Sequence, residues 1–558
     1  MMPLPTATEM RALDEDTIAR LGIPGGILME SAGRGVVTVL HQLHDATKIN
    51  LGQAQILVIA GPGNNGGDGM VIARYRHEQG LRFELWGVAE RARVRSDARL
   101  HLVAAEATGV TAHFCDGDTT LLRERLASLQ REDLIVDALL GTGLQRSVTG
   151  ELARVIASMN ASRAVTVSVD LPSGLDADRG VPSDATTEPC IVRADYTVTL
   201  AFPKLGLVGS PGFLFAGEIF LADIGIPNSL CPRHKVSAQL VDASVLALLA
   251  APRSPIGHKG SHGHLLIIAG SQGKLGAALL STEAALRTGV GLCTLALPKD
   301  AQDGSLGSRC PEAMTLPYVL AEPALEDQLL PALSGKSALA VGPGLAPVPA
   351  IRKLLLTLLA HGPQPMVFDA EAINQLVGAE SHLLARARRG AATVLTPHPG
   401  EAARLLGTTS AAIQADRVTA ARTIAEKTGS VVVLKGARTL IVEPPEPAKR
   451  ASESRLAVIP TGNPAMGSGG MGDVLTGMIA ALLASGWATF DAACAAAYWH
   501  GLAGDLVSAR RAPGSIVLGT EVIAALEEAR SVGGQFATSH RPWPIVPLAW
   551  TQGRQERP

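Results

Sequence analysis

Aromatic residues and a surplus of either charge are both scarce in this chain. Phe, Trp and Tyr account for only 3% of its residues, which argues against a stacking surface for single-stranded nucleic acid. The formal net charge is −2, so the chain has no overall basic footprint and nucleic acid is not an expected partner. With 47% hydrophobic and 18% charged residues, the composition is that of an ordinary globular protein.

Cysteine pairs and long apolar runs are also missing. The six cysteines are widely spaced and none forms a C-x-x-C pair, so the sequence suggests neither a zinc site nor a disulfide framework and fits a reducing cytosol. The N-terminus lacks a basic segment followed by an apolar one, and no apolar run approaches the roughly 20 residues that span a bilayer. We therefore expect a cytoplasmic protein with no signal peptide and no membrane partner.

The first half of the chain repeats one pattern, a short β-branched run followed by a turn rich in Gly, Pro and Asp. The runs cover residues 56–60, 134–137, 165–170 and 196–200. Helical stretches separate them, for example residues 70–79 and 121–129. Apolar strands that alternate with helices predict a parallel sheet covered on both faces. Ligands of such sheets bind beyond the carboxyl ends of the strands, so the four turns are expected to line one crevice.

A second strand–helix series follows a stretch punctuated by prolines near residues 225–262. Its expected strands cover residues 264–269, 292–296, 338–341, 366–369, 393–395 and 431–434. A length of 558 residues also favours more than one core. We predict two α/β domains, residues 1–238 and 239–530, followed by a loosely ordered tail at residues 531–558, where no clear periodicity is present.

The segment at residues 463–473, with the sequence NPAMGSGGMGD, is the most informative part of the chain. Its glycines let backbone N–H groups approach an anion, and the apolar helix that follows adds positive potential at its N-terminus. Asp473 would repel a phosphate, so it is better placed to take a proton from the group that attacks the phosphate. We predict an anion-binding loop with Asp473 as a catalytic base.

Further turns of the second half carry candidate ligand-binding residues. Residues 273–277 and 342–344 are glycine turns after strands, and a double-proline turn presents His398. Residues 435–439 place a cation, Lys435, and a hydroxyl after another strand, as binding of a nucleotide phosphate requires. Taken alone, His398 is more often a turn residue and Lys435 more often a solvated cation.

The turns of the first half carry oxygen-bearing side chains. The segment NNGGDG at residues 64–69 follows a strand and opens a helix, but its adjacent amides distinguish it from the dinucleotide fingerprint. Amide oxygens there, with the Asp137 carboxylate and the Ser173 hydroxyl, would form an all-oxygen site that suits a hard cation. Asp170 closes a strand at the same crevice and is a candidate acid–base group, although strand-end carboxylates also cap turns.

The stretches GPGNNGGDG, VDALLGTGL, VDLPSG and TLAFPKLG, in this order in the first half, resemble the NAD(P)H-hydrate epimerase domain. This resemblance implies a Rossmann-like three-layer sandwich that binds hydrated NAD(P)H and potassium. It implies that Asn65, Asp137 and Ser173 coordinate potassium and that Asp170 lies at the nicotinamide. It further implies a substrate site formed by Asn64, Asn65, Gly66, Gly67, Asp68, Gly141, Thr142, Gly143, Leu144, Gln145, Arg146, Ser147 and Asp170.

The features of the second half together resemble the ADP-dependent NAD(P)H-hydrate dehydratase, a ribokinase-like domain. The match includes HKGSHGH at residues 258–264, DAEAIN at residues 369–374 and GNP at residues 462–464. One departure is Ala346: residues 342–346 are GPGLA, whereas the family usually has GPGLG, with glycine at the last position. The resemblance implies that the hydrated cofactor is bound by Ala277, Gly344, His398 and Asp473, and that ADP is bound by Lys435, Gly436, Ala437, Arg438, Thr439 and Gly472.

These resemblances imply a bifunctional enzyme of metabolite repair, an isomerase joined to a lyase. The first domain would interconvert the R and S hydrates of NADH and NADPH, and the second would dehydrate the S form at the expense of ADP. Potassium and Mg²⁺ are the expected cofactors, and a homo-oligomer is the expected assembly. One alternative is a ribokinase-superfamily small-molecule kinase joined to a nucleotide-binding scaffold. A non-enzymatic sensor or scaffold is the other, and the retained Asp68, Asp137 and Asp170 argue against it.

Overall fold

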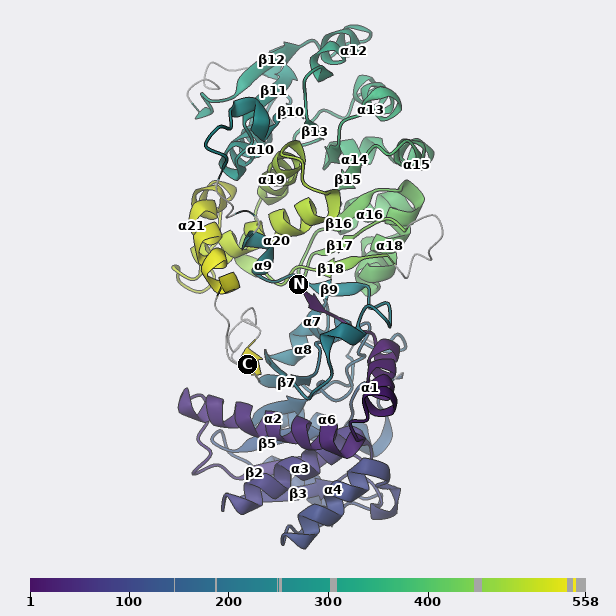
Figure 1. Cartoon of the computed structure of the whole chain (residues 1–558), viewed down its shortest axis with the longest axis vertical. Helices are drawn as coiled ribbons and strands as arrows, with labels where there is room; N and C mark the ends of the chain where they lie inside the picture. Colours follow the sequence, from purple (N-terminus) through teal and green to yellow (C-terminus); the bar gives the residue numbers. More distant parts are fainter. Residues whose placement is uncertain are drawn as a thin grey trace. The chain divides into compact units, whose positions relative to one another are not determined.

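The computed structural model describes residues 1–144, 146–185, 188–247, 249, 253–301, 309–445, 454–538 and 545–547. The chain forms two compact units. The N-terminal unit is built from residues 3–238 together with Ile545–Pro547, and the C-terminal unit from residues 1–2 and 239–538. Each unit contains its own sheet with helices packed against it (Figure 1).

The N-terminal sheet is parallel over most of its width. Its strands run in the spatial order β19-β8-β7-β6-β5-β2-β3-β4, and every neighbouring pair from β8 to β4 is parallel. The strands are β2 (Ile56–Ala60), β3 (Phe83–Gly87), β4 (Ala112–Phe114), β5 (Leu134–Ala138), β6 (Val165–Val169), β7 (Tyr196–Leu200), β8 (Glu218–Ala222) and β19 (Ile545–Pro547). The four strands expected from the sequence in this half are confirmed as β2, β5, β6 and β7.

Helices cover both faces of this sheet, because successive residues of a strand point to opposite faces and every residue of the central strands is buried. In β2, Ile56, Val58 and Ala60 pack against helices α2 (Gly25–Asp45), α3 (Asn64–Glu78) and α4 (Ser96–Ala107). Leu57 and Ile59 of the same strand pack against α5 (Thr120–Ser128) and α6 (Gly150–Ala161). The unit is therefore the expected Rossmann-like three-layer sandwich. Helix α1 (Ala7–Leu21) packs separately, with Met10 and Leu13 against Phe202 and Ile226.

The glycine segment after β2 is helical, and this differs from the sequence expectation. Helix α3 begins at Asn64, whereas the pattern predicted a turn to residue 69 and a helix from residue 70. The reason is close packing: a Cβ on Gly66 would lie 1.8 Å from the carbonyl oxygen of Gly61, and one on Gly67 would lie 2.4 Å from the sulfur of Met29. These glycines let α3 start directly against the strand end rather than forming a flexible turn.

The C-terminal sheet has the spatial order β1-β9-β18-β17-β16-β15-β14-β13-β10-β11-β12. Neighbouring strands are parallel from β12 to β16, and β17 and β18 join antiparallel. The strands are β1 (Met2–Pro3), β9 (Ala238–Leu240), β10 (His264–Ile268), β11 (Leu292–Pro298), β12 (Met314–Tyr318), β13 (Ala338–Val341), β14 (Met366–Phe368), β15 (Thr393–Leu395), β16 (Val431–Leu434), β17 (Leu440–Val442) and β18 (Leu456–Val458). The strands expected here are confirmed, with ends shifted by at most two residues.

Helices connect these strands. They include α10 (Leu275–Thr288), α12 (Ala324–Leu329), α13 (Pro349–His361), α14 (Glu371–Gln375), α15 (Glu380–Arg388), α16 (Pro399–Leu406), α17 (Ser410–Ala415), α18 (Arg417–Thr428), α19 (Met471–Ala484), α20 (Thr489–Ser508) and α21 (Gly519–Thr538). Helices α10 and α19 approach closely, because a Cβ on Gly477 would lie 2.1 Å from the carbonyl oxygen of Ser281. In the described part of the chain, no helix combines the length and apolarity needed to cross a membrane.

The expected tail at residues 531–558 contains regular structure where it is described. Helix α21 continues to Thr538, and Ile545–Pro547 form β19, which pairs antiparallel with β8. A three-residue edge strand is too short to show an alternating pattern of apolar and polar residues, so it could not be predicted. The rest of the tail lies outside the described residues.

Candidate active sites

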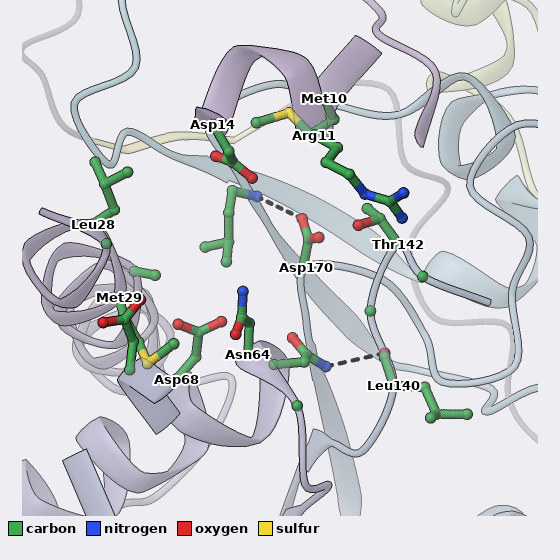
Figure 2. A pocket seen from close by; sticks show the side chains of 18 of the residues that line it. Met10, Arg11, Asp14, Leu28, Met29, Asn64, Asp68, Leu140, Thr142 and Asp170 are labelled. Carbon is green, nitrogen blue, oxygen red and sulfur yellow. Dashed lines mark hydrogen bonds between the residues drawn. The ribbon is translucent and has the colours of Figure 1, made fainter. Parts of the chain in front are cut away.

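The N-terminal unit contains a cavity of about 570 Å³ at the carboxyl ends of its central strands, a size typical of small-molecule sites. Eight of the substrate-binding residues expected from the sequence line it: Asn64, Asn65, Asp68, Gly141, Thr142, Gly143, Leu144 and Asp170. Figure 2 shows Asn64 and Asp68 of α3 and Asp170 at the end of β6 directed into the same space. The structure therefore brings the ends of all four predicted strands to one crevice, since Lys204 of the turn after β7 lines the cavity as well.

The remaining expected substrate residues do not line this cavity. Gly66 and Gly67 lie in the packed first turns of α3 and are absent from its lining. Arg146 and Ser147 are absent as well, and Ser147 instead donates from its N–H and its hydroxyl to Asp184 Oδ1, both at 2.9 Å. Gln145 lies outside the described residues. The sequence pattern led to segments that lie at the cavity but could not distinguish cavity-lining residues from packing residues within them.

Asp170 follows β6 directly and is held in place by several donors. The Lys204 ammonium forms an ion pair with Asp170 Oδ1 and is only 1% exposed. The backbone N–H of Leu200 donates to the same oxygen at 3.1 Å. The backbone of Asp170 has a φ of 65°, a left-handed conformation that side chains adopt rarely and that often marks a functional position. The candidate acid–base group is therefore an ion-paired carboxylate at the floor of the cavity.

The three expected potassium ligands form one connected network. The Ser173 hydroxyl donates to Asp137 Oδ1 at 2.6 Å, and its N–H donates to Asp137 Oδ2 at 2.8 Å. Asn65 Nδ2 donates to the Leu140 carbonyl at 3.0 Å, and the Leu140 N–H donates to the Ser173 hydroxyl at 2.9 Å. Burial raises the pKa of Asp137. The atoms of these three side chains that could bind a metal ion are oxygens, as a hard monovalent cation requires.

Sequence reasoning missed one whole wall of the cavity. Helix α1 contributes Met10, Arg11 and Asp14 to this wall, whereas Lys204 belongs to the predicted turn after β7. Burial raises the pKa of Asp14 to about 6. Burial and the neighbouring Asp170 raise the pKa of Asp68 well above its usual range. Residues on α1 lie outside the strand–turn pattern, so only the polar Asp14 on an otherwise apolar helix face could have drawn attention to them.

The C-terminal unit gathers its candidate residues at the carboxyl ends of parallel strands, where ligands of such sheets bind. Asp369 follows β14, His398 lies in the turn after β15, and Lys435 follows β16. Gly344 follows β13, and a Cβ placed on it would lie 3.0 Å from the Cβ of Ala277 in the first turn of α10. The expected substrate residues Ala277 and Gly344 are thus neighbours.

Asp473 is the third residue of α19, whose first turn follows the glycine-rich segment. The helix starts after Gly470, which has a φ of 93°, and the first N–H groups of a helix have no intrahelical partners. Burial, with the neighbouring Asp369 carboxylate, raises the pKa of Asp473 to about 6 although Lys435 opposes the shift. A carboxyl group with this pKa can accept a proton at neutral pH.

Lys435 is not a solvated cation. Its Nζ lies 2.6 Å from Asp369 Oδ1 and 3.9 Å from Glu401 Oε2, with 19% of its side chain exposed. Burial opposes the charged form, but the Asp369 and Glu401 carboxylates raise the pKa of Lys435 above its usual value. Gly472 adjoins this pair, since a Cβ on it would lie 3.2 Å from Lys435 Nζ. The cation therefore stands beside the first turn of α19.

His398 caps α16. Its Nδ1 accepts a hydrogen bond from the N–H of Gly400 at 2.9 Å, and the Glu401 carboxylate accepts one from the backbone N–H of His398 at 2.7 Å. Half of the histidine side chain is exposed, and its Nε2 lies 3.2 Å from Glu401 Oε1. His398 thus acts as a turn residue, which is the commoner role of a histidine in such a turn. Its partly exposed ring contacts Glu401, which in turn lies near Lys435.

The loop expected to bind ADP connects β16 to β17 and is anchored at several points. The N–H of Lys435 donates to the Pro397 carbonyl at 2.9 Å, and Arg438 Nη1 donates to the Pro460 carbonyl at 2.6 Å. Arg438 has a φ of 55°, and burial lowers its pKa to about 10. The Thr439 hydroxyl donates to the Gly436 carbonyl at 3.0 Å. Gly436 and Ala437 complete the turn.

Two carboxylates that hold this site together were not among the expected site residues. Asp369 is 1% exposed and accepts from Lys435, from the Thr396 hydroxyl at 2.7 Å and from the Thr476 hydroxyl at 2.9 Å. Asp505 on α20 accepts from the Gly462 N–H at 3.0 Å and from Asn463 Nδ2 at 2.8 Å. Their roles depend on contacts across long sequence distances, which a strand–turn pattern does not reveal.

Comparison with known proteins covers both units. A family described as NAD(P)H-hydrate dehydratase matches residues 265–527, and one described as YjeF-related protein N-terminus matches residues 25–206. The chain is 40% identical to the bifunctional NAD(P)H-hydrate repair enzyme Nnr of Moorella thermoacetica over 524 residues, which cover 93% of this chain and 95% of that protein. It is 33% identical to the corresponding enzyme of Escherichia coli (strain K12), covering 90% of this chain and 89% of that protein.

Solved structures match the C-terminal unit. One is the ADP/ATP-dependent NAD(P)H-hydrate dehydratase from Bacillus subtilis, co-crystallised with ATP and Mg²⁺, which is 26% identical to this chain. The match has a TM-score of 0.43 and covers 53% of this chain and 98% of that one.

Proposed function

The chain belongs to the family of bifunctional NAD(P)H-hydrate repair enzymes, and we propose how its residues divide the two reactions. The N-terminal unit is the epimerase, which interconverts the R and S hydrates of NADH and NADPH. The C-terminal unit is the dehydratase, which restores NAD(P)H from the S form. The observation that supports this division most directly is Asp473 in the first turn of α19, beside the cation of Lys435.

In the dehydratase, Asp473 takes the proton from the C6 hydroxyl of the S hydrate. The hydroxyl oxygen then attacks the terminal phosphoryl group of ADP. Backbone N–H groups of residues 469–472 stabilise the charge that develops on this group. The phosphate leaves as the ring nitrogen donates its lone pair, and loss of the C5 proton restores the reduced ring. The raised pKa of Asp473, about 6, supports its role as the base.

ADP is the proposed phosphoryl donor, held by the loop from Lys435 to Thr439 together with Gly472. The ammonium of Lys435, already placed beside the first turn of α19, faces the transferred group. Ala277, Gly344 and His398 would hold the hydrated nicotinamide. Mg²⁺ would arrive on the phosphates of the nucleotide, because in the described ranges no group of three His, Cys, Asp or Glu side chains is arranged to hold a metal ion by itself.

In the epimerase, the cavity binds the hydrated nicotinamide with Asp170 as an acid–base residue. The ion pair with Lys204 fixes the Asp170 carboxylate at the end of β6. Asn64, Asp68 and the turn from Gly141 to Leu144 would bind the rest of the nucleotide. A Cβ on the glycines of this turn would meet either nothing or only the Asn65 side chain at 3.5 Å. A ligand can therefore contact the backbone of the turn without a steric clash.

Potassium fits the network of Asn65, Asp137 and Ser173. Asn65 uses its Nδ2 to hold the Leu140 carbonyl, which leaves its Oδ1 as a ligand oxygen. The buried Asp137 has a raised pKa because burial disfavours its charge, and a cation beside it would stabilise the charged form. When bound, potassium would supply charge compensation and would hold the turn after β5 in shape.

The assembly and location of the protein are also proposals. A cytoplasmic location is supported by six cysteines that are all free, as expected in a reducing compartment. A homo-oligomer stays a prediction, and light scattering of the purified protein would check it.

One assay tests the proposed function. Purified protein is given mixed NADPH hydrates with ADP, with ATP or without nucleotide, in potassium or sodium buffer. Return of the reduced-nicotinamide absorbance together with release of inorganic phosphate identifies dehydration. A phosphorylated product without return of absorbance would instead identify a small-molecule kinase. Complete consumption of both hydrates demonstrates the epimerase, whereas consumption of the S form alone would contradict it.

A further inference from the structure

Inversion at C6 of the nicotinamide ring needs proton transfer at two positions. The hydroxyl must leave one face of the ring and an oxygen must return to the other. One group protonates the departing hydroxyl, and a second accepts a proton from the arriving water. Asp170 on the cavity floor supplies one of these groups, so the other must come from a different wall.

Asp14 meets this requirement. It lies on α1, which contributes one wall of the cavity, and Met10 and Ile18, one turn before and after it, line the same space. Figure 2 shows the Asp14 carboxylate directed into the cavity that also receives Asp68 and Asp170. Among the described residues, no hydrogen bond or ion pair engages the Asp14 carboxylate, whereas Asp170 is paired with Lys204. Its oxygens are thus available to a ligand.

We propose that Asp14 is a second catalytic residue of the epimerase, acting on the face of the ring opposite Asp170. This inference rests on the proposed function, because it assigns a partner to Asp170 in the same cavity. It goes beyond that function by giving α1 a chemical role.

The surroundings of Asp14 suit proton exchange near neutral pH. The charged groups that face it are Glu15 and Arg11 on α1, Asp68 on α3, Asp170 after β6, and Lys204 after β7. Burial, together with the carboxylates of Asp170 and Glu15, outweighs Lys204 and raises the pKa of Asp14 to about 6.

The third carboxyl group, Asp68, is suited to a different task. It is only 6% exposed, and burial raises its pKa well above the usual range. Its neutral form is therefore favoured, and in that form it would donate a hydrogen bond to the ligand. Asp14, by contrast, has a pKa that allows both acid and base forms.

The step balances without any further reagent. The protonated Asp14 gives its proton to the C6 hydroxyl, the C6–O bond breaks, and water leaves as the ring nitrogen forms a C=N bond with C6. Water then adds to C6 from the other face, the nitrogen regains its lone pair, and Asp170 takes the released proton. The C5 protons remain in place throughout. In the reverse direction the two carboxyl groups exchange roles, and solvent resets their protonation.

The test compares Asp14→Asn with Glu15→Gln in the full chain. Glu15 is the next residue of α1 and is exposed, so its variant makes a similar charge change outside the cavity. Chiral separation of the hydrates, corrected for spontaneous epimerisation, gives the rate of R-to-S conversion at several substrate concentrations and from pH 5 to pH 8. ADP-dependent consumption of the S hydrate, measured on the same samples, reports an intact C-terminal unit, and thermal unfolding reports the fold of the N-terminal unit, which carries Asp14.

We expect Asp14→Asn to lower the epimerisation kcat by about 100-fold or more, to leave S-hydrate consumption unchanged, and to remove the limb of the pH–rate profile near pH 6. Glu15→Gln should keep the wild-type kcat, with its pH limb lowered only slightly, because Glu15 makes the smallest of the upward contributions to the pKa of Asp14. Asp14→Glu, which keeps a carboxyl group, should recover part of the rate, and it replaces Asp14→Asn as the test if the latter does not fold. A wild-type kcat or pH limb in Asp14→Asn, or a change confined to KM, overturns the inference. A wild-type protein that fails to epimerise overturns the proposed function instead.

Discussion

Lys435 Nζ lies 2.6 Å from Asp369 Oδ1, so the cation of the dehydratase site is ion-paired within its own unit. The epimerase site has the same arrangement, a buried Lys204 paired with Asp170 at a strand end. In each case a carboxylate at the carboxyl end of a parallel strand fixes a lysine that would otherwise move on a flexible side chain. Each site therefore has an oriented charge before any ligand binds.

Replacement of Asp473 by Asn should abolish dehydration and leave epimerisation intact. An amide of similar shape cannot accept the hydroxyl proton, and loss of a general base lowers a rate by about 10²–10⁴-fold. Return of absorbance with ADP measures the first activity, and chiral separation of the hydrates measures the second. Asp491→Asn is the matched control, because Asp491 is the third residue of α20 as Asp473 is of α19. Normal ADP-dependent turnover by Asp473→Asn would rule out the base assignment.

The dehydration rate should also fall in acid. The pKa of Asp473 is raised to about 6, and the base must be unprotonated, so activity is full above pH 7 and falls tenfold for each unit below pH 6. With an ordinary aspartate the fall would begin about two units lower. Initial rates with saturating ADP, measured from pH 5 to pH 8, distinguish the two. A flat profile down to pH 5 would contradict the raised pKa.

Asp369→Asn should destabilise the C-terminal unit strongly. It leaves Lys435 without its main partner, and removing one member of a buried ion pair costs about 3–5 kcal/mol. Denaturant unfolding without nucleotide should show this loss. Asp327→Asn, at an exposed position of α12, should change stability by no more than about 0.5 kcal/mol. Equal unfolding midpoints for the two variants would mean that the ion pair contributes nothing to the stability of the C-terminal unit.

The sequence predicted the central strands because they are buried on both faces. Every residue of β2, β5, β6 and β7 is buried, so each reads as a short run rich in apolar and β-branched residues. The edge strand β4 has no fully buried residue and β12 has only one, so neither leaves such a run. The turns predicted after the central strands lead to the cavity of the N-terminal unit and to the ion pair of Lys435 with Asp369 in the C-terminal unit.

Individual site residues were harder to predict than the sites. Gly66 and Asp68 are two positions apart in one motif, yet Gly66 packs against Gly61 and Asp68 faces the cavity. The start of α3 at Asn64 decides which of them points inward, and that start depends on contacts with the strand ends. The residues around Asp14 and Asp369 come from segments far away in the sequence, so no local spacing reveals that these two carboxyl groups belong to the sites.

Asp170→Ala should leave the R hydrate unconsumed while the S hydrate is still processed. This variant also leaves the buried Lys204 unpaired, which costs about 3–5 kcal/mol, so lost activity alone could reflect lost structure. The double variant Asp170→Ala/Lys204→Met removes both charges and should recover most of the stability but none of the epimerisation. Thermal unfolding and chiral separation of the hydrates measure the two properties. Recovery of epimerisation in the double variant would show that Asp170 serves only to neutralise Lys204.

Potassium should stabilise the N-terminal unit, and Ser173→Ala should remove most of this effect. A ligand that binds only the folded state adds about 2.7 kcal/mol at 100 times its dissociation constant. Unfolding is followed in potassium chloride and in choline chloride at equal ionic strength. Ser128→Ala, on the exposed surface of α5, should keep the potassium response. Identical unfolding in the two salts for the wild type would exclude a potassium site.

Asp68→Asn should stabilise the N-terminal unit at neutral pH while lowering epimerase activity. The pKa of Asp68 is raised well above 3.8, chiefly by burial, so the folded state holds a proton that the unfolded chain has released. The wild type therefore loses up to about 1.4 kcal/mol of stability per pH unit above pH 4, until the folded-state pKa is reached. Asparagine has no charge to bury, so the variant's advantage should be absent below pH 4 and should grow toward neutral pH. Unfolding curves of both proteins from pH 4 to pH 8 measure it, and an advantage that stays constant across this range would contradict a buried, protonated Asp68.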